Sequence, residues 1–224
     1  FEGYKTEDAR NYGTLSTEEI ISKSSNVGMV KLCADFDPSQ ILRTYYSLGL
    51  GKYMNEIFIS TREGYLPEYK NLSLREKVSL CYGYGLQTTL VQLTSAYSTI
   101  FSGGVYRPLK LIKNSSRFEE ERILSKEHAR DIKKILYKAI KNGTGFRAKV
   151  NDHDVFGKTG TARIFKNQKY NDDLHNALFI GMTKIEDKEY LVGLFVKNPK
   201  INGEGGGDVA APIFSEIIET IQKL

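Results

Sequence analysis

The sequence lacks several features that would assign it to a specialised class of protein. It has only two cysteines, Cys33 and Cys81, each inside an apolar stretch, which favours two buried thiols over a disulfide or a metal pair. No apolar run approaches the length of a membrane-spanning helix, and the first residues do not resemble a signal peptide. The net charge is +5, but basic residues are mixed with acidic ones, so a dedicated nucleic-acid surface is not expected.

The 224 residues, 40% of them hydrophobic, can bury the core of one large domain or of a piece of one. The chain begins at Phe1 rather than at a methionine, which is typical of a fragment. We therefore expect a longer parent protein. Apolar residues at helical spacing, with capping and stop residues at their ends, predict helices near 16–21, 27–33, 39–48, 73–81, 88–101 and 125–140.

The last third of the sequence has the alternation and turns of a sheet. A strand is expected at 155–165, and two apolar strands at 176–183 and 190–196 are joined by the charged turn 186–188, which predicts an antiparallel meander. Residues 166–173 are predicted to be a polar connection, residues 53–71 a loop, and residues 105–113 a short strand with Pro108 at an edge. A final helix at 209–221 should cover the sheet, so the fold class is α+β.

The predicted strand at 155–165 contains an unusual set of residues in its middle, Lys158, Thr159, Gly160 and Thr161. Gly160 weakens a strand and often marks the close approach of a ligand or another backbone, and Lys158 could receive an anion. A sheet edge that a lysine protects from further pairing explains the same residues. A phosphate-binding P-loop is excluded, because Asp152 occupies the position of its first glycine.

Two further polar segments interrupt the helical region. Ser24 and Asn26 lie in a short turn between two predicted helices, where they could point into a cleft or cap a helix. The run Tyr82-Gly83-Tyr84-Gly85-Leu86 indicates either backbone held close to another group or a packed aromatic turn.

Taken together and in order, these segments resemble the conserved motifs of penicillin-recognising serine enzymes, Ser-x-Asn at Ser24 and Asn26 and Lys-Thr-Gly-Thr at 158–161. The surrounding segments 23–28, 82–86, 143–145 and 206–214 resemble class B penicillin-binding proteins in particular, with the cell-division transpeptidase as the nearest type. The similarity runs from about Gly3 to the C-terminus. It implies a fold of the penicillin-binding protein and serine β-lactamase type.

The resemblance also implies a role for each motif residue. The reaction would be acyl transfer from D-alanyl-D-alanine stem peptides, in which Ser24 relays a proton to the leaving amine and Asn26 holds the substrate's backbone amide. Lys158 would supply positive potential beside Ser24, and Thr159 and Thr161 would bind the terminal carboxylate. Gly160 would leave room for the peptide, and the Thr161 backbone N–H would form half of the oxyanion hole.

One motif of the resembled family is missing. No serine in the sequence is followed three residues later by lysine, so the nucleophilic Ser-x-x-Lys is expected upstream of Phe1. Residues 1–224 are accordingly interpreted as the C-terminal portion of one transpeptidase domain. Without its upstream part, this chain is expected to be inactive.

The resemblance implies no cofactor and no metal ion. Its implied partners are peptidoglycan stem peptides, β-lactam antibiotics, a glycosyltransferase and other membrane proteins of cell division. Its implied location is the extracytoplasmic face of the cell envelope, with an upstream membrane anchor. A serine β-lactamase or D,D-carboxypeptidase shares the motifs, and a non-catalytic sensor or scaffold shares the fold, so both remain alternatives.

Other candidates carry less weight in the sequence. Packing explains Tyr82 and Tyr84 as well as a direct role in the site does. Solvent exposure likewise explains Arg163. The three histidines, His128, His153 and His175, lie far apart in the sequence and are predicted to be surface residues rather than ligands.

Overall fold

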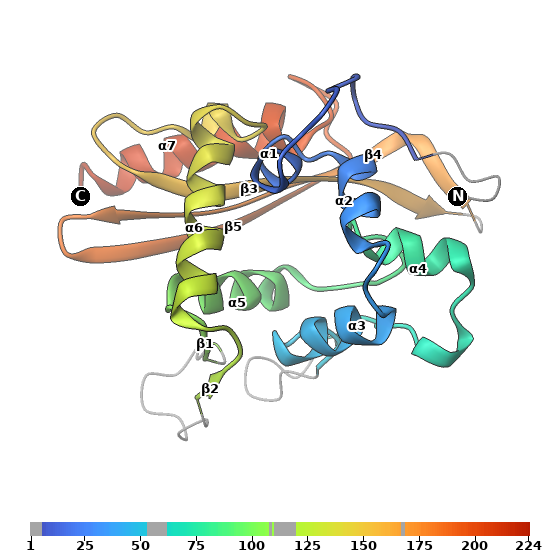
Figure 1. Ribbon diagram of the computed structural model, residues 1–224. Coiled ribbons are helices and arrows are strands. Elements are labelled where there is room, and N and C mark those ends of the chain that lie inside the picture. Colours follow the sequence, from blue (N-terminus) through green and yellow to red (C-terminus); the bar gives the residue numbers. More distant parts are fainter. Residues whose placement is uncertain (1–5, 53–61, 108, 110–119, 167–168) are drawn as a thin grey trace. The chain divides into compact units, whose positions relative to one another are not determined.

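A computed structural model describes residues 6–52, 62–107, 109, 120–166 and 169–224 (Figure 1). The chain divides into two compact units, Phe1–Ala129 and Arg130–Leu224, and each is described here by itself. The first unit is mainly helical and the second carries an antiparallel sheet, which confirms the predicted α+β class. Among the described residues, no helix combines the length and the apolar character needed to cross a membrane.

The helices of the first unit begin where the sequence supplies side-chain caps. Ser16 and Ser73 each form a capping box with the glutamate three residues later, at the start of α1 (Thr17–Ser22) and α4 (Leu74–Leu80). Asp37 caps α3 (Pro38–Ser47), whose first turn contains proline. The other helices of this unit are α2 (Asn26–Cys33), the 3₁₀ turn η1 (Tyr69–Asn71) and α5 (Leu90–Phe101).

Two predicted elements of this unit differ from the structure. Helix α5 begins two residues later than predicted, because Thr89 is its N-cap and accepts a hydrogen bond from the Gln92 N–H. The strand predicted at 105–113 is described only as β1 (Val105–Tyr106), which pairs antiparallel with β2 (Glu121–Arg122). Pro108 and residues 110–113 lie outside the described residues. So do residues 53–61 of the predicted loop.

The second unit contains the predicted meander. Strands β3 (Val155–Lys166), β4 (Lys169–Ile185) and β5 (Lys188–Lys197) pair antiparallel in the order β3-β4-β5. The prediction of a polar connection at 166–173 was wrong. Strand β4 begins at Lys169, and its pairing with β3 extends as far as Lys166 opposite Lys169. Cross-strand hydrogen bonding therefore extends the hairpin through residues whose polarity alone indicated a loop.

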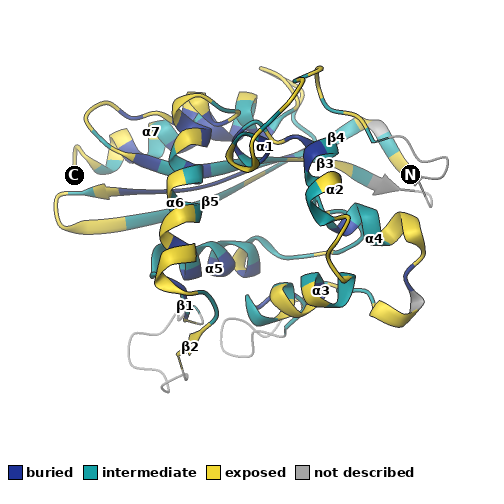
Figure 2. Ribbon diagram, in the orientation of Figure 1, coloured by how far each residue is buried: buried dark blue, intermediate teal, exposed yellow. Residues whose placement is uncertain are grey.

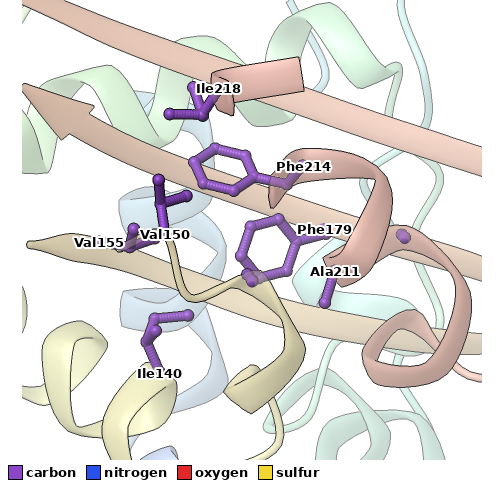
Figure 3. Packing of buried hydrophobic residues seen from close by; sticks show 9 residues of the cluster. Ile140, Val150, Val155, Phe179, Ala211, Phe214 and Ile218 are labelled. Atoms are coloured by element: carbon purple, nitrogen blue, oxygen red, sulfur yellow. The ribbon is translucent and has the colours of Figure 1, made fainter. Parts of the chain in front are cut away.

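The core of the second unit lies where its last helix packs on the sheet. Phe179 of β4 and Phe214 of α7 (Ala211–Ile221) are fully buried, with ring centroids 5.1 Å apart (Figure 3). The expectation that the final helix covers the sheet is thus confirmed. Figure 2 shows this buried face and, in contrast, the exposed turn between β4 and β5. The cluster also includes Ile140, Ala148, Val150, Val155, Ala210, Ala211 and Ile218.

Three further elements belong to the described part of this unit. Helix α6 (Lys126–Lys141) crosses the boundary between the two units, and its first turn is capped by Ser125, whose hydroxyl accepts from the His128 N–H at 3.0 Å. The 3₁₀ turn η2 (Phe146–Ala148) follows it, and a π-helical turn, η3 (Gly206–Ala210), leads into α7.

Replacing Phe214 with alanine should lower the free energy of unfolding by about 3–5 kcal/mol, because the buried ring leaves a cavity. Phe195→Ala is the matched control: Phe195 lies on β5, is 47% exposed, and should cost less than about 1 kcal/mol. Urea denaturation of both variants measures the difference. Equal losses would contradict the assignment of the core to the interface of α7 with β4.

Candidate active site

Ser24 occupies a strained position at the end of α1. Its φ is +57°, a left-handed conformation that glycine usually supplies at this place in a helix terminus. The backbone bonds around it, Ser24 N–H to the Ile21 carbonyl at 3.2 Å and Ser25 N–H to the Ile20 carbonyl at 2.9 Å, form a Schellman motif. A serine at this exposed position costs conformational energy that glycine would not.

The capping role considered for Ser24 and Asn26 belongs to the residue between them. Ser25 is buried, and its hydroxyl oxygen accepts a hydrogen bond from the Gly28 N–H at 2.8 Å, which caps α2. The sequence predicted Asn26 in a short turn between two helices, but Asn26 is the first residue of α2. Gly28 allows α2 to pack closely on α1, because a Cβ there would lie 2.6 Å from Ile20 Cγ1.

Asp8, which the sequence did not single out, holds this turn from outside the motif. Its carboxylate accepts from the Ser25 hydroxyl at 2.6 Å and from the Val27 N–H at 3.1 Å. A carboxylate at a helix N-terminus is favoured by the unpaired N–H groups and the positive end of the helix dipole. Asp8 therefore fixes the backbone that carries Ser24 and Asn26. No local sequence pattern predicts this contact, because Asp8 lies far from the turn in the sequence.

Lys158, Thr159, Gly160 and Thr161 lie together in the middle of β3, which is an edge strand of the sheet within the described residues. Lys158 donates a hydrogen bond to the Thr159 carbonyl oxygen at 3.0 Å. Burial lowers the pKa of the Lys158 ammonium from its ordinary 10.5 to about 8, because the charged form loses hydration. The group is thus still protonated at neutral pH, close to its titration range.

Two hydroxyls of this strand are already oriented by neighbouring loops. The Thr159 and Thr144 hydroxyl oxygens are 2.6 Å apart, and the Thr161 hydroxyl oxygen accepts from the Gly206 N–H at 3.1 Å. A hydroxyl that accepts one bond still has its own proton to donate. The arrangement can therefore present hydroxyl donors from Thr159 or Thr144 and from Thr161 to an anion.

The glycine that packing requires here is Gly206 rather than Gly160. A Cβ on Gly160 would meet only the Leu178 side chain, at 3.4 Å, which is ordinary contact. A Cβ on Gly206 would collide with the Leu178 carbonyl oxygen and lie 2.5 Å from the Gly160 carbonyl oxygen. The bare backbone of Gly206 thus lies directly against β3, while the space above Gly160 is not filled by a tight protein contact.

The remaining candidates have local explanations. Tyr82 and Tyr84 pack on each other with ring centroids 5.6 Å apart, and the glycines after each of them have positive φ with no atom near their missing Cβ. This favours the packed aromatic turn over a close backbone approach. Arg163 is exposed, next to a register shift between β3 and β4.

The histidines are only partly as predicted. His128 is exposed, but His153 donates a hydrogen bond from Nδ1 to the Lys184 carbonyl oxygen at 2.9 Å. The His175 side chain is only 15% exposed and lies 3.1 Å from a Glu204 carboxylate oxygen. The surface prediction was thus wrong for His175, because its strand position beside the Gly-rich loop covers the ring. Within the described residues, no three acidic, histidine or cysteine side chains are grouped as a metal site would require.

Comparison with known proteins identifies the family. The family model described as "Penicillin binding protein transpeptidase domain" matches residues 1–219. The chain belongs to this family. Ser24 and Asn26 lie in the first unit and residues 158–161 in the second, each held by the local contacts described above.

Curated relatives of this penicillin-binding protein chain carry transpeptidase names. It is 33% identical over 213 residues to the probable peptidoglycan D,D-transpeptidase PenA of Neisseria flavescens, covering 95% of this chain and 53% of the relative. It is 30% identical over 217 residues to the peptidoglycan D,D-transpeptidase FtsI of Escherichia coli, covering 96% of this chain and 37% of the relative. The chain thus spans about half the length of these relatives, or less.

Solved structures agree with the family fold. The transpeptidase domain of penicillin-binding protein 3 from Burkholderia pseudomallei matches with a TM-score of 0.87 and 30% identity, over 96% of this chain and 66% of that one. Penicillin-binding protein 3 from Mycobacterium tuberculosis, complexed with aztreonam, matches with a TM-score of 0.87 and 28% identity, over 99% of this chain and 54% of that one. The resemblance read from the motifs, and the fold it implied, are confirmed.

Asp8→Ala should destabilise the first unit by about 0.5–2 kcal/mol, because Ser25 and the Val27 N–H lose their acceptor. Asp35→Ala, which removes an exposed carboxylate beyond the other end of α2, is the control and should cost no more than about 0.5 kcal/mol. Urea unfolding measures both. If the two variants lose the same stability, Asp8 does not hold the turn.

Proposed function

We propose that this chain is the C-terminal part of a peptidoglycan D,D-transpeptidase domain, which forms peptide cross-links by serine acyl transfer from D-alanyl-D-alanine stem peptides. The observation that carries the proposal is the exposed Ser24, held at φ +57° on the Ser-x-Asn turn while its neighbour Ser25 performs the capping. The transpeptidase names of the relatives support the same reaction.

The nucleophile of this reaction is proposed to lie upstream, because no serine in the sequence has lysine three residues later. Its oxygen forms an ester with the carbonyl of the penultimate D-alanine, and the terminal D-alanine leaves as an amine that must gain a proton. The amine of a second stem peptide then attacks the ester and restores the serine. Each half of the reaction needs a proton relay and an oxyanion site.

Ser24 is proposed to relay a proton to the leaving amine, and Asn26 is proposed to bind the substrate's backbone amide. Ser24 is an exposed residue with a left-handed backbone at the end of α1. Ser25 and Asp8 satisfy the N-terminus of α2, so neither motif side chain is needed for that purpose. The turn is thereby held rigidly, which a catalytic group requires.

Lys158, Thr159 and Thr161 are proposed to anchor the carboxylate that stem peptides and β-lactams share. The Lys158 ammonium, with a pKa of about 8, supplies charge from a desolvated position where electrostatic attraction is stronger than in water. The Thr161 hydroxyl, fixed by the Gly206 N–H, can donate its proton to the carboxylate, and the backbone N–H of Thr161 is the proposed half of the oxyanion hole.

The partners and the location are proposed from the relatives. The solved complex of the Mycobacterium tuberculosis protein with aztreonam supports β-lactams as ligands, and the relatives named FtsI support a part in cell-division wall synthesis. A glycosyltransferase and other membrane proteins of cell division are proposed as further partners. We propose that the domain lies at the extracytoplasmic face of the cell envelope, where peptidoglycan is assembled, with an upstream anchor. The transpeptidase names favour this function over a β-lactamase, a carboxypeptidase or a non-catalytic scaffold.

The parent protein that carries this chain should form a covalent adduct with fluorescent penicillin, visible on a denaturing gel, whereas residues 1–224 alone should not. The adduct should map to a serine upstream of Phe1 and should persist, because a transpeptidase deacylates slowly. Labelling of this chain alone would disprove the upstream nucleophile. Rapid release of the drug would favour the hydrolase, and no labelling of the parent protein would favour the non-catalytic scaffold.

Substitutions at Ser24 should separate activity from stability. In the parent protein, Ser24→Ala should slow acylation by penicillin by about 10²- to 10⁴-fold, the usual range for general acid–base catalysis. Ser24→Gly should slow acylation similarly yet raise stability, by on the order of 1 kcal/mol, because glycine adopts the left-handed backbone without strain. Acylation kinetics and thermal melting measure the two effects.

Ser25→Ala is the matched control for Ser24. It removes the cap and the contact with Asp8, so it should lower stability by about 1 kcal/mol while leaving a hydroxyl at position 24. If Ser24→Ala melts at a lower temperature and acylates normally, Ser24 has only a structural role.

The carboxylate anchor predicts that two changes do not add. Thr161→Val should reduce acylation by about 10- to 150-fold, the value of a hydrogen bond of about 1.5–3 kcal/mol to a charged group. A penicillin whose carboxylate is converted to an uncharged amide should lose reactivity with the native protein, but much less with the Thr161→Val variant. Acylation rates for the four combinations test this, and full additivity would rule out the contact.

Thr183→Val provides the control for strand packing, since Thr183 is buried in β4 and donates to the Asp154 carbonyl oxygen at 2.9 Å. It should lower stability and leave the preference for the anionic penicillin unchanged. That preference should itself fall as the pH rises through about 8, where Lys158 loses its proton. Lys158→Arg should keep the preference to higher pH.

A further inference from the structure

The two cysteines of the sequence come from helices that contact each other in the first unit. Cys33 is the last residue of α2, Cys81 is the C-cap of α4, and these helices pack together (Figure 1). Cys33 acts on the Cys81 thiol as a hydrogen-bonding and charged neighbour. The Cys81 thiol also donates a weak hydrogen bond to the Lys77 carbonyl oxygen, at 3.6 Å. Forty-seven residues of chain separate two side chains that the fold brings together.

A third helix fixes the geometry of this pair. Tyr45 of α3 donates a hydrogen bond from its hydroxyl to the Leu80 carbonyl oxygen at 2.9 Å, directly before Cys81. Burial, followed by the two neighbouring cysteines, raises the pKa of the Tyr45 hydroxyl to about 12, so this ring lies beside both thiols. Three helices therefore converge on the thiols, which are positioned by backbone elements rather than by a loose segment.

Both thiols remain open to reagents. Cys33 and Cys81 are only partly buried, which corrects the sequence prediction of two buried thiols. The prediction was wrong because each cysteine lies at the end of its helix, where the apolar face meets solvent.

We propose that Cys33 and Cys81 form a modification site, at which an oxidant of the disulfide class joins α2 to α4 through a disulfide bond. The thiolate of one cysteine attacks the disulfide of the oxidant and releases one of its sulfurs as a thiol. The second cysteine then attacks the mixed disulfide and releases the other. The two cysteines lose two protons and two electrons, and the oxidant is reduced to two thiols.

The surroundings of Cys81 hold the proton on its thiol. Burial, and then the hydrogen bond and charge of Cys33, raise the pKa of the Cys81 thiol to about 12, so it forms a thiolate with difficulty. Closure should become faster as the pH rises.

The bond would constrain the far end of the helix that begins with Asn26. Closing the loop of residues 34–80 restricts the unfolded chain, which is the main way a disulfide stabilises a fold. An oxidising extracytoplasmic compartment would let such a bond persist. The inference rests on the contact between α2 and α4 and does not depend on the proposed transpeptidase activity.

The test treats the folded parent protein with oxidised glutathione, blocks remaining thiols with N-ethylmaleimide, and digests it with trypsin without reduction. Mass spectrometry should detect the peptide Leu32–Arg43 linked to Val78–Lys110, about two hydrogen masses below the sum of the two reduced peptides. Reduction should restore both separate peptides. The oxidised protein should also unfold at a higher urea concentration than the reduced one.

Single variants test the two-step exchange. Cys33→Ser and Cys81→Ser should each stop at a mixed disulfide between glutathione and the remaining cysteine, and neither should give the linked peptide. If both cysteines of the native protein react with N-ethylmaleimide after oxidation, or give only glutathione adducts and links between molecules, the proposal is overturned. This outcome is measured on the native protein, so it does not depend on whether a variant folds.

Discussion

The close approach of Gly206 to β3 is the constraint on which the Lys-Thr-Gly-Thr strand depends. Because residue 206 has no side chain, its backbone rests against the carbonyl oxygens of Leu178 and Gly160, and its N–H reaches the Thr161 hydroxyl. The same turn continues into α7, which places Phe214 against the sheet. The orientation of the Thr161 hydroxyl is thus linked to the hydrophobic core, because the same core fixes the turn, the strand and the helix.

Both motif segments carry a local energetic cost. Ser24 adopts a backbone conformation that glycine would adopt without strain, and the ammonium of Lys158 is deprived of water. Strain and desolvation of this kind persist where surrounding contacts enforce them, as Asp8 and Ser25 do around the turn. Their presence in a chain of the penicillin-binding protein family is consistent with retention for chemistry.

The residues that support the motifs were harder to predict than the motifs themselves. Helix starts at Ser16, Asp37 and Ser73 followed from capping chemistry, which acts within four residues. Asp8 escaped, since a carboxylate that accepts bonds from residues 17 and 19 positions away leaves no periodic or local signature. Segment 143–145 was singled out by resemblance, but the pairing of the Thr144 hydroxyl with Thr159 was not predicted. The strand at 169–175 escaped because cross-strand pairing, rather than composition, made it extended.

The sequence by itself determined the helix boundaries that depend on caps, the antiparallel meander, and the two motifs that name the family, because each is a short-range pattern of residue types. The tertiary structure decided which groups meet. It made Ser25 rather than Ser24 the cap, set Gly206 against β3, and brought Cys33 beside Cys81. These contacts join residues far apart in the chain, and the packing of helices and strands that creates them is a cooperative property that no local segment encodes.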